Sequence, residues 1–411
     1  MQTLTFIREN ARWLSAGILL TFLSSFGQTF FISIFAGEIR EGFRLSHGEW
    51  GGLYSLGTGV SAIAMVWAGG LTDIFRVRAV GAVILALLAV ACIAMALNPV
   101  WWLLPVVIFA LRFTGQGMSS HIATVAMARW FIATRGRALS VSKLGFSLGE
   151  SVLPVLFVAL MLVMDWHLLW LIAAGIALFS APVLLLLLRQ ERTPQSHAQS
   201  GQSVGMESRH WTRNQTFRHW LFWFMIPALL GPSAFNTTFF FHQVHIAQIK
   251  SLSHVELVAM FPFYTAISII AMMLSGWALD KVGTARLIPW MQVPMVAAFI
   301  IFAFAQDSWG MLSGFFFLGV NSGFNNTLPS AFWAEFYGTR HIGAIKAMAA
   351  AVMVLGSAIG PGISGVAIDL GVGIEVQFLW IALFFIISTV TMAIGVSRAK
   401  GLLAKPLPGA P

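Results

Sequence analysis

Charged residues are scarce in this chain, and cysteine is almost absent. Asp, Glu, Lys and Arg make up 9% of the 411 residues, whereas apolar residues make up 58%. A soluble domain carries roughly 25% charged residues. A water-soluble fold of this size would therefore lack polar cover, and the composition indicates a membrane-embedded protein. The single cysteine, Cys92, excludes an internal disulfide and a cysteine metal site.

The sequence also lacks motifs for ATP hydrolysis and for enzyme catalysis. It contains no G-x-x-x-x-G-K-[ST] loop, so we expect that ATP does not drive this protein directly. No Ser/His/Asp set or zinc spacing stands out, and we predict a non-enzyme without cofactors. His242 and His245 are three residues apart, but no acidic or cysteine partner lies near them in the sequence. We interpret them as residues at the mouth of a cavity and predict no metal site.

Twelve apolar runs are long enough to cross a bilayer. A helix needs about 20 mostly apolar residues to do so, and long continuous runs favour helices over the short alternating strands of a barrel. The expected fold is an all-α polytopic membrane protein. Its twelve transmembrane helices are predicted at 13–36, 50–71, 79–97, 101–128, 139–163, 166–188, 219–246, 256–279, 286–305, 309–333, 343–368 and 377–397.

Basic residues are unevenly distributed between the loops. With a cytoplasmic N-terminus, 20 of the 24 Lys and Arg residues face the cytoplasm; only Arg40, Arg44 and Lys250 face outside, and Arg112 lies within the membrane. This bias predicts cytoplasmic N- and C-termini in a plasma membrane, here a bacterial inner membrane. It also accounts for the net charge of +9 by attraction to anionic lipid, without nucleic acid as a partner.

A polar segment divides the spans into two groups of six. Residues 189–218 are rich in Ser and Gln, and we interpret them as a flexible cytoplasmic linker. The predicted organisation is a first six-helix bundle at 1–188, this linker, a second six-helix bundle at 219–400, and a cytoplasmic tail at 401–411.

The chain repeats itself at an interval of about half its length. "SSFGQTFF" at 24–31 returns as "SAFNTTFF" at 233–240. Three further pairs follow in the same order: 69–73 with 276–280, 111–117 with 317–323, and 145–150 with 356–361. Four ordered matches indicate two copies of one six-helix unit, both with the same membrane orientation.

The loop after the second run carries Gly69-x-Leu71-x-Asp73 with Arg78, and its second copy carries Gly276-x-x-x-Asp280-Lys281-x-Gly283. In these motifs the chain resembles the major facilitator superfamily, over essentially its whole length. The first copy departs from the family pattern, because Ile74 and Arg76 stand where a basic residue and a glycine are usual. The fifth run, "RGRALSVSKLGFSLGESVLP", is most similar to the monocarboxylate and oxalate/formate porter branch.

This resemblance implies a gate between the two halves at the cytoplasmic side. On that reading, the gating residues are Gly69, Asp73, Arg78, Gly276, Asp280, Lys281 and Gly283. Small residues permit close contact between helices, and the aspartates can accept hydrogen bonds from a helix start. The alternative is a capped tight turn without a role in transport.

The resemblance also implies a central cavity lined by the first, fourth, seventh and tenth helices. Uncharged polar residues interleaved with phenylalanine suit a small polar ligand; the alternative is hydrogen bonding between helices. The predicted substrate-binding residues are Gln28, Thr29, Arg112, Gln116, Asn236, Thr237, Asn321 and Asn325.

Arg112 and Glu150 are the charged residues predicted deep in the membrane. An arginine there is costly and usually faces an interior with a partner. In one interpretation the two residues form a structural ion pair. In the other, Arg112 binds an anionic substrate while Glu150 carries a proton or tunes that arginine. Lys143, Ser147 and Glu150 share one helix face by their spacing.

Together these features predict a secondary active transporter that works by alternating access, functions as a monomer in the lipid bilayer and moves a small organic anion of the mono- or dicarboxylate type. Protons or a counter-anion would be its coupling partners. One alternative is an efflux pump for amphipathic drugs or metabolites. Another is a membrane sensor that binds a ligand without moving it.

Overall fold

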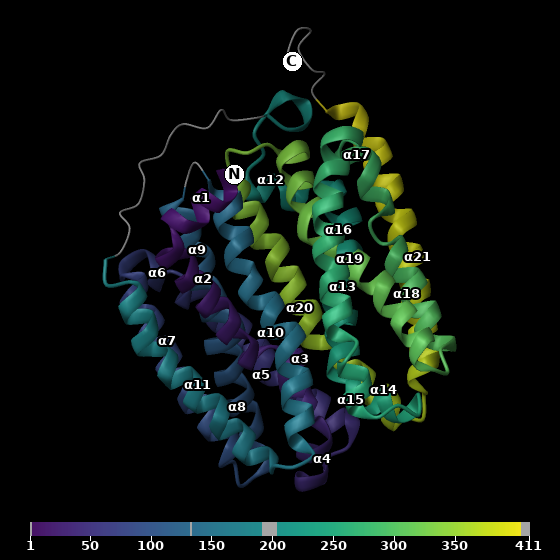
Figure 1. The fold of residues 1–411 in the computed structure, drawn as a ribbon. Helices are drawn as coiled ribbons and strands as arrows, with labels where there is room; N and C mark the ends of the chain where they lie inside the picture. Colours follow the sequence, from purple (N-terminus) through teal and green to yellow (C-terminus); the bar gives the residue numbers. More distant parts are fainter. Residues whose placement is uncertain (1, 132–133, 191–203, 404–411) are drawn as a thin grey trace.

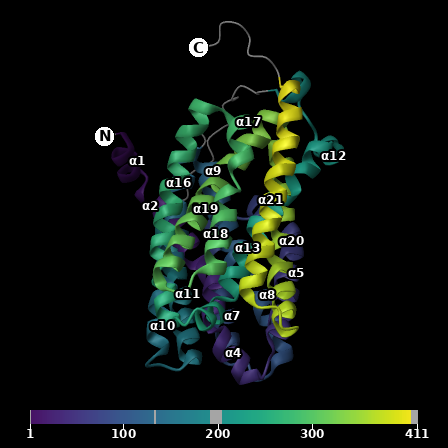
Figure 2. The same ribbon diagram turned by 90° about the vertical axis from the view of Figure 1, so that its right-hand side faces the viewer.

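The structure is a computed structural model that describes residues 2–131, 134–190 and 204–403. Within these ranges all regular secondary structure is helical, and the long helices run side by side along the molecule (Figures 1 and 2). The N-terminus and α12 lie at the end of the bundle where α21 leads to the C-terminus, here called the termini end. The opposite end, which holds α4, α14 and α15, is called the far end.

The first half consists of eleven α-helices and four short segments of other helix types. The α-helices are α1 (Gln2–Glu9), α2 (Ala11–Leu23), α3 (Thr29–Ile32), α4 (Ala36–Phe43), α5 (His47–Ala68), α6 (Leu71–Ile74), α7 (Val77–Ala96), α8 (Leu104–Leu111), α9 (Ser120–Trp130), α10 (Arg135–Met161) and α11 (Trp166–Leu187). The other segments are η1 (Ser24–Gly27), η2 (Ser33–Phe35), η3 (Trp101–Leu103) and the π-helix η4 (Arg112–Ser119).

The second half has longer and less interrupted helices. They are α12 (Arg213–Arg218), α13 (Trp220–Phe241), α14 (Gln243–Ile249), α15 (His254–Val258), α16 (Phe261–Val282), α17 (Thr284–Leu287), α18 (Val293–Phe304), α19 (Ser308–Tyr337), α20 (Ile342–Asp369) and α21 (Ile374–Ala399). Short 3-10 turns lie at η5 (Met206–Ser208), η6 (Ile288–Trp290) and η7 (Lys400–Leu402).

Every predicted run is helical, but not every run is a simple span. In the described part of the chain, nine helices are long and apolar enough to cross a membrane; a tenth span arises if the pair 11–27 and 29–43, bent by 50°, is taken as one. The remaining two runs are 101–128, which η4 divides, and 309–333, where α19 carries the polar stretch "NSGFNNT". The all-α polytopic fold is therefore confirmed, with two spans made atypical by polar or broken segments.

Local sequence signals set the ends of several helices. Ser46 and Glu49 form a reciprocal capping box at the start of α5, with hydrogen bonds of 3.1 and 2.8 Å. Gly338 ends α19 with a φ of 79°, and Gly283 ends α16 with a φ of 83°. Glycine is favoured at such positions because it has no Cβ atom to clash at positive φ.

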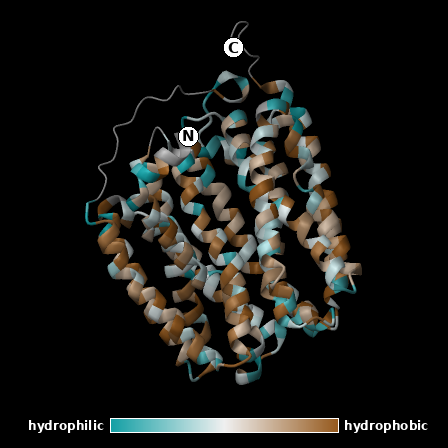
Figure 3. Cartoon of the chain, in the orientation of Figure 1, coloured by the Kyte–Doolittle hydropathy of each residue, from teal (hydrophilic) through white to brown (hydrophobic). Residues whose placement is uncertain are grey.

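The outer surface of the bundle is largely apolar along the length of the helices, with hydrophilic residues concentrated toward the two ends (Figure 3). Large side chains such as Val66, Trp67, Phe179 and Trp309 are more than 70% exposed. In water this surface would be costly, whereas lipid covers it without penalty. The pattern supports a multi-pass membrane protein.

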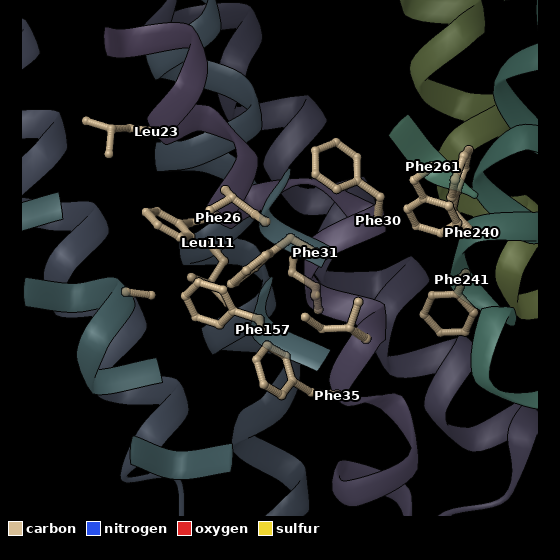
Figure 4. Packing of buried hydrophobic residues seen from close by; sticks show 14 of the residues in the cluster. Leu23, Phe26, Phe30, Phe31, Phe35, Leu111, Phe157, Phe240, Phe241 and Phe261 are labelled. Carbon is tan, nitrogen blue, oxygen red and sulfur yellow. The ribbon is translucent and has the colours of Figure 1, made fainter. Parts of the chain in front are cut away.

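Aromatic side chains fill the interior of the first half. Phe31 lies at the centre of one group, 4.9 Å from Phe157 and 5.4 Å from Trp170 between ring centroids. Figure 4 shows Phe26, Phe31 and Phe157 gathered around the break between α2 and α3. This packing fixes a segment that lacks the regular hydrogen bonds of an α-helix.

The predicted flexible linker at 189–218 is in part wrong. Residues 191–203 lie outside the described part of the chain, but residues 204–218 are folded against the second half. Met206 is fully buried and Trp211 is 6% exposed, and the Trp211 backbone N–H donates to the Tyr337 carbonyl oxygen at 3.1 Å. The segment has few apolar residues, so its composition did not predict that Met206 and Trp211 pack against the second half.

Candidate functional site

A cavity of about 420 Å³ lies between the two halves, midway along the long helices. Most of its lining side chains carry a hydroxyl, an amide or a charge. The lining residues are Thr21, Gln28, Thr29, Phe30, Gln116, Ser120, Thr124, Lys143, Phe146, Ser147, Glu150, Asn236, Thr237, Phe240, Tyr264, Thr265, Ser268, Ile269, Met272, Ser322 and Asn326. This volume and polarity suit one small ligand with several polar groups.

The cavity extends toward the termini end. In each of three spans, one lining residue lies closer to that end than another lining residue of the same span. These pairs are Thr124 and Gln116, Lys143 and Glu150, and Met272 and Tyr264, with the residue nearer the termini end given first. Toward the far end the two halves are joined by hydrogen bonds. Ser33 Oγ donates to the Phe240 carbonyl oxygen at 2.7 Å, and Gln243 Nε2 donates to the Phe30 carbonyl oxygen at 3.1 Å.

The first span is broken where it reaches the cavity. η1 ends at Gly27, and Gln28 has an extended backbone with φ −86° and ψ 153° before α3 begins. Gly27 lies directly against η4, because a Cβ atom there would be 2.8 Å from the Cα atom of Gly115. No side chain fits at this crossing. The break places Gln28 and Thr29 on the cavity wall.

The fourth span has π-helical hydrogen bonding at the same level, in η4. Such segments occur frequently at functional sites, because they change the direction of side chains within a helix. A Cβ atom on Gly117 would be 2.7 Å from the Met65 sulfur. Gly115 and Gly117 thus both contact neighbouring helices, while Gln116 between them faces the cavity.

Arg112 lies behind the cavity wall rather than on it. The side chain is 1% exposed. Its guanidinium donates hydrogen bonds to the Gly27 carbonyl oxygen at 3.2 Å and to Thr29 Oγ1 at 3.3 Å, and its Cζ atom lies 5.5 Å from the Tyr54 ring centroid. Thr29 and the Tyr54 hydroxyl share a hydrogen bond of 2.6 Å. Arg112 therefore holds the wall residue Thr29 in place, and its own atoms do not reach the cavity.

The structural ion pair between Arg112 and Glu150 is wrong for this conformation. Glu150 Oε2 accepts a hydrogen bond from Thr265 Oγ1 at 3.2 Å. Among the residues that the structure describes, Arg112 forms no ion pair. The reason is the helix break, which brings the Gly27 carbonyl and the Thr29 hydroxyl to the guanidinium. Because Thr265 belongs to α16, the Glu150 hydrogen bond connects the two halves.

Lys143, Ser147 and Glu150 line the cavity together, as their shared helix face predicts. Lys143 is the cation of the described lining, and it forms no hydrogen bond or ion pair with any described residue. Its ammonium group therefore lies beside the cavity without a compensating carboxylate.

In the second half, α13 contributes Asn236 and Thr237 to the lining. The Asn236 Oδ1 atom is buried and has no hydrogen-bond partner within the described ranges. A buried polar atom without a partner is costly unless something binds it. Asn236 is therefore the lining residue most clearly in need of a ligand or water.

Asn321 and Asn325 lie on a different side of α19 from the cavity. Asn321 is fully buried, and its Nδ2 donates to Gln292 Oε1 at 2.8 Å. Asn325 Nδ2 donates to Asn321 Oδ1 at 2.8 Å. The cavity is lined instead by Ser322 and Asn326, each one position further along. Both pairs have four-residue spacing, so the sequence alone does not decide which face points inward.

The α16 side chains in the lining were not predicted. Tyr264, Thr265 and Ser268 line the cavity opposite Glu150. The sequence contains the signal, because Ser268 lies four positions after Tyr264 and three after Thr265 in an otherwise apolar run, a spacing that places both on the same helix face as Ser268. The family resemblance implies a lining from four other helices.

The predicted gating residues lie at the termini end. The Gly69 carbonyl oxygen accepts a hydrogen bond from Thr72 Oγ1 at 2.9 Å and lies 3.1 Å from His121 Nε2. A Cβ atom on Gly276 would meet nothing within 4 Å, so close helix contact at Gly276 is absent in this conformation. Lys281 Nζ lies 4.5 Å from the Trp277 ring centroid.

Three further members of the gating set are placed less fully. The side chains of Asp73 and Asp280 lie outside the described part of the structure. Arg78 is half-buried near the start of α7, and it interacts with a neighbour. The gating role therefore stays a prediction.

The predicted mouth histidines lie at the far end, where they meet a third. The His47 ring centroid is 4.4 Å from that of His245 and 6.0 Å from that of His242. Within the described ranges, no group of three or more His, Cys, Asp or Glu residues has the geometry to hold a metal ion.

The comparison with protein families gives a match. The profile of the Major Facilitator Superfamily matches residues 17–361 and 264–409. Comparison with curated protein sequences finds no match.

Two solved structures illustrate the similarity in fold. One is a bacterial homolog of the human lysosomal transporter Spinster in an inward-facing, unoccupied conformation, with a TM-score of 0.74 and 13% identity over 97% of this chain and 99% of that chain. The other is the nucleoside transporter NupG, with a TM-score of 0.70 and 14% identity over 95% and 98% of the two chains. At such identities the likeness shows the fold alone.

Proposed function

Because this chain belongs to the major facilitator superfamily and is a multi-pass membrane transporter, we propose that it moves a small organic anion by alternating access. The anion is of the mono- or dicarboxylate type, and its movement is coupled to protons or to a counter-anion. The likeness of the fifth span to the monocarboxylate and oxalate/formate porter branch supports this substrate class.

The observation that carries the proposal is the unpaired ammonium group of Lys143. It faces the cavity without a hydrogen bond or ion pair to any described residue. An uncompensated positive charge on the wall of a cavity favours a ligand of the opposite sign. Behind the wall, the buried Arg112 adds a second positive charge without an ion-pair partner of its own. We therefore assign Lys143, rather than Arg112, as the direct contact for a carboxylate.

Glu150 is the proposed proton carrier. It is the carboxylate of the described lining, and it is hydrogen-bonded to Thr265 in the other half. Loss or gain of a proton at Glu150 would change that contact between halves, which links protonation to their relative movement. Neutralisation of Glu150 would also increase the positive charge that an anion meets in the cavity.

We further propose that the termini end is cytoplasmic, because this orientation places 20 of the 24 basic residues on that side. A cavity that extends toward the termini end then corresponds to an inward-facing state. The prediction that the protein functions as a monomer is retained as part of the proposal.

Ligand binding to the purified protein tests the substrate class. We expect at least one mono- or dicarboxylate to raise the melting temperature, since a ligand at 100 times its Kd adds about 2.7 kcal/mol to the folded state. The uncharged amide of the same compound should have no effect. Lys143→Gln should weaken carboxylate binding by about tenfold or more, the loss of roughly 1.4 kcal/mol.

Lys400→Gln is the matched control, because Lys400 is exposed in η7 and lies outside the cavity lining. It should keep the original affinity. Equal binding of the acid and the amide would refute an anionic substrate, and unchanged affinity in Lys143→Gln would refute Lys143 as the contact for the carboxylate. Accumulation of the bound carboxylate in proteoliposomes would separate a transporter from a sensor.

A further inference from the structure

The two halves meet most closely along α5 and α20, at the far end. Glycines make this seam tight. A Cβ atom on Gly51 would lie 2.6 Å from the Pro361 carbonyl oxygen, and one on Gly365 would lie 2.3 Å from the His47 carbonyl oxygen. The backbones therefore approach more closely than side chains would allow.

Asp369, the last residue of α20, bonds to the start of α5 across this seam. Its carboxylate accepts hydrogen bonds from the backbone N–H groups of His47 at 3.1 Å and Gly48 at 2.7 Å. These are among the N–H groups at a helix start that have no partner within the helix, and the positive end of the helix dipole lies there. A Cβ atom on Gly48 would be 2.6 Å from Asp369 Oδ2, so glycine is what admits the carboxylate.

Two other aspartates cap helices, but within their own half. Asp165 Oδ1 accepts from the His167 N–H at 2.8 Å at the start of α11, and Asp307 Oδ1 accepts from the Gly310 N–H at 2.7 Å at the start of α19. Relative movement of the halves leaves these two caps intact. It breaks the cap that Asp369 forms.

A charged group near Asp369 strengthens this arrangement. The Arg40 guanidinium from α4 interacts electrostatically with the carboxylate. Arg40 belongs to the first half, so this attraction also acts between the halves.

We propose that Asp369 is a positioning residue for transport, which closes the far end by capping α5 from the opposite half. The cavity opens toward the far end only when the His47 and Gly48 N–H groups leave the carboxylate. Loss of this cap shifts the protein toward the state that is open at the far end. The inference rests on alternating access and not on the identity of the substrate.

A cysteine reporter at the seam measures the shift directly. In a Cys92→Ala background, Ser55→Cys places a thiol against Gly362, where a Cβ atom on the glycine would be 2.8 Å from the Ser55 oxygen. A bulky maleimide should label this thiol in purified protein only when the halves part. Asp369→Ala should raise the labelling rate about fivefold, the effect expected from the loss of one helix cap. Asp307→Ala removes a cap within one half and should leave the rate unchanged.

A second pair of variants leaves the Asp369 carboxylate in place. Gly48→Ala should raise labelling like Asp369→Ala, because the new methyl group displaces the carboxylate. Gly52→Ala is the control, since a Cβ atom there meets nothing within 4 Å. In the Asp369→Ala background, Gly48→Ala should add little, since the remaining close neighbour of the methyl group would be Val366 at 3.2 Å.

Labelling of Asp369→Ala no faster than Asp307→Ala would overturn the proposal, as would additive effects of Gly48→Ala and Asp369→Ala. Because no substrate enters the assay, its result is independent of whether the transported compound is an anion.

Discussion

The twin segments 24–31 and 233–240 share most of their residues and differ in structure. In the first, η1 and the extended Gln28 interrupt the helix, and the crossing partner η4 is π-helical. In the second, α13 runs without a break from Trp220 to Phe241, and its partner α19 is a continuous helix. Nearly the same sequence therefore gives a broken helix in one half and a regular helix in the other.

The difference arises at two positions of the repeat. Gly27 stands where the second copy has Asn236, and only glycine permits the close contact with η4. Arg112 stands where the second copy has Leu318. The Leu318 side chain is buried in the apolar interior and needs no polar partner. The buried guanidinium needs acceptors, and the break supplies the Gly27 carbonyl and the Thr29 hydroxyl.

The charged residues of the cavity are also divided unevenly between the two halves. The two charged lining residues, Lys143 and Glu150, both come from α10 in the first half. The repeat equivalent of Glu150 is Pro361, whose carbonyl oxygen packs against Gly51 at the seam. The second half contributes neutral hydroxyls and amides to the cavity. We infer that coupling depends on the first half and that the second half responds through Thr265.

The largest expected effect is that of Glu150→Gln on transport. Glutamine keeps the shape and an acceptor for Thr265 but cannot release a proton, so proton-driven accumulation should stop while ligand binding and exchange continue. The measurement is uptake into proteoliposomes with and without a pH gradient. Glu256→Gln, in the capping box of α15, is a control outside the cavity. Accumulation at the original rate in Glu150→Gln would remove the coupling role from the first half.

Gly27→Ala should have the largest effect on stability. A Cβ atom there would be 2.1 Å from the Leu111 carbonyl oxygen, and neither backbone can move away easily. We expect a loss of about 3 kcal/mol, at the upper end of overpacking effects, seen as a lower melting temperature in detergent. Asn236→Ala at the equivalent position should change stability by about 0.5 kcal/mol or less. Similar losses in both variants would contradict the asymmetry of the repeat.

Asn321→Ala should cost about 2 kcal/mol, because Gln292 Oε1 loses its buried donor and Asn325 Nδ2 loses the Asn321 Oδ1 acceptor. Ligand affinity should hardly change, since Asn321 does not line the cavity. Ser322→Ala should behave in the opposite way, with near-normal stability and weaker binding. Melting curves and titrations of the two variants distinguish these roles, and a binding defect confined to Asn321→Ala would reverse the assignment of the α19 faces.

The smallest effect is expected for the threonines that correspond in the two copies. Thr29→Val loses hydrogen bonds to Tyr54 and Arg112 and should destabilise the protein by about 1 kcal/mol, with slower transport. Thr29→Ser keeps the hydroxyl group and should restore both the stability and the transport rate. Thr238→Val loses only a bond to the Ala234 carbonyl oxygen and should be close to neutral. If Thr238→Val slowed transport as much as Thr29→Val, the two copies would be equivalent in function.

Local properties of the sequence determined the membrane fold, the helical runs and the twofold repeat. Apolar length and the positions of basic residues are properties of short segments, so they could be read without contacts. Gln28, Thr29, Gln116, Asn236 and Thr237 were also predicted at the cavity, from their polarity within apolar runs together with the family resemblance, and all five line it.

Contacts between distant residues decided the rest. The partner of Arg112 depends on Gly27 meeting Gly115 from another helix, and the inward face of α19 depends on Gln292 binding Asn321 rather than Ser322. The docking of 204–218 depends on Met206 and Trp211 finding a site near Tyr337. Each choice selects between arrangements that are equivalent in local spacing and propensity, and only packing against the neighbouring helix distinguishes their free energies.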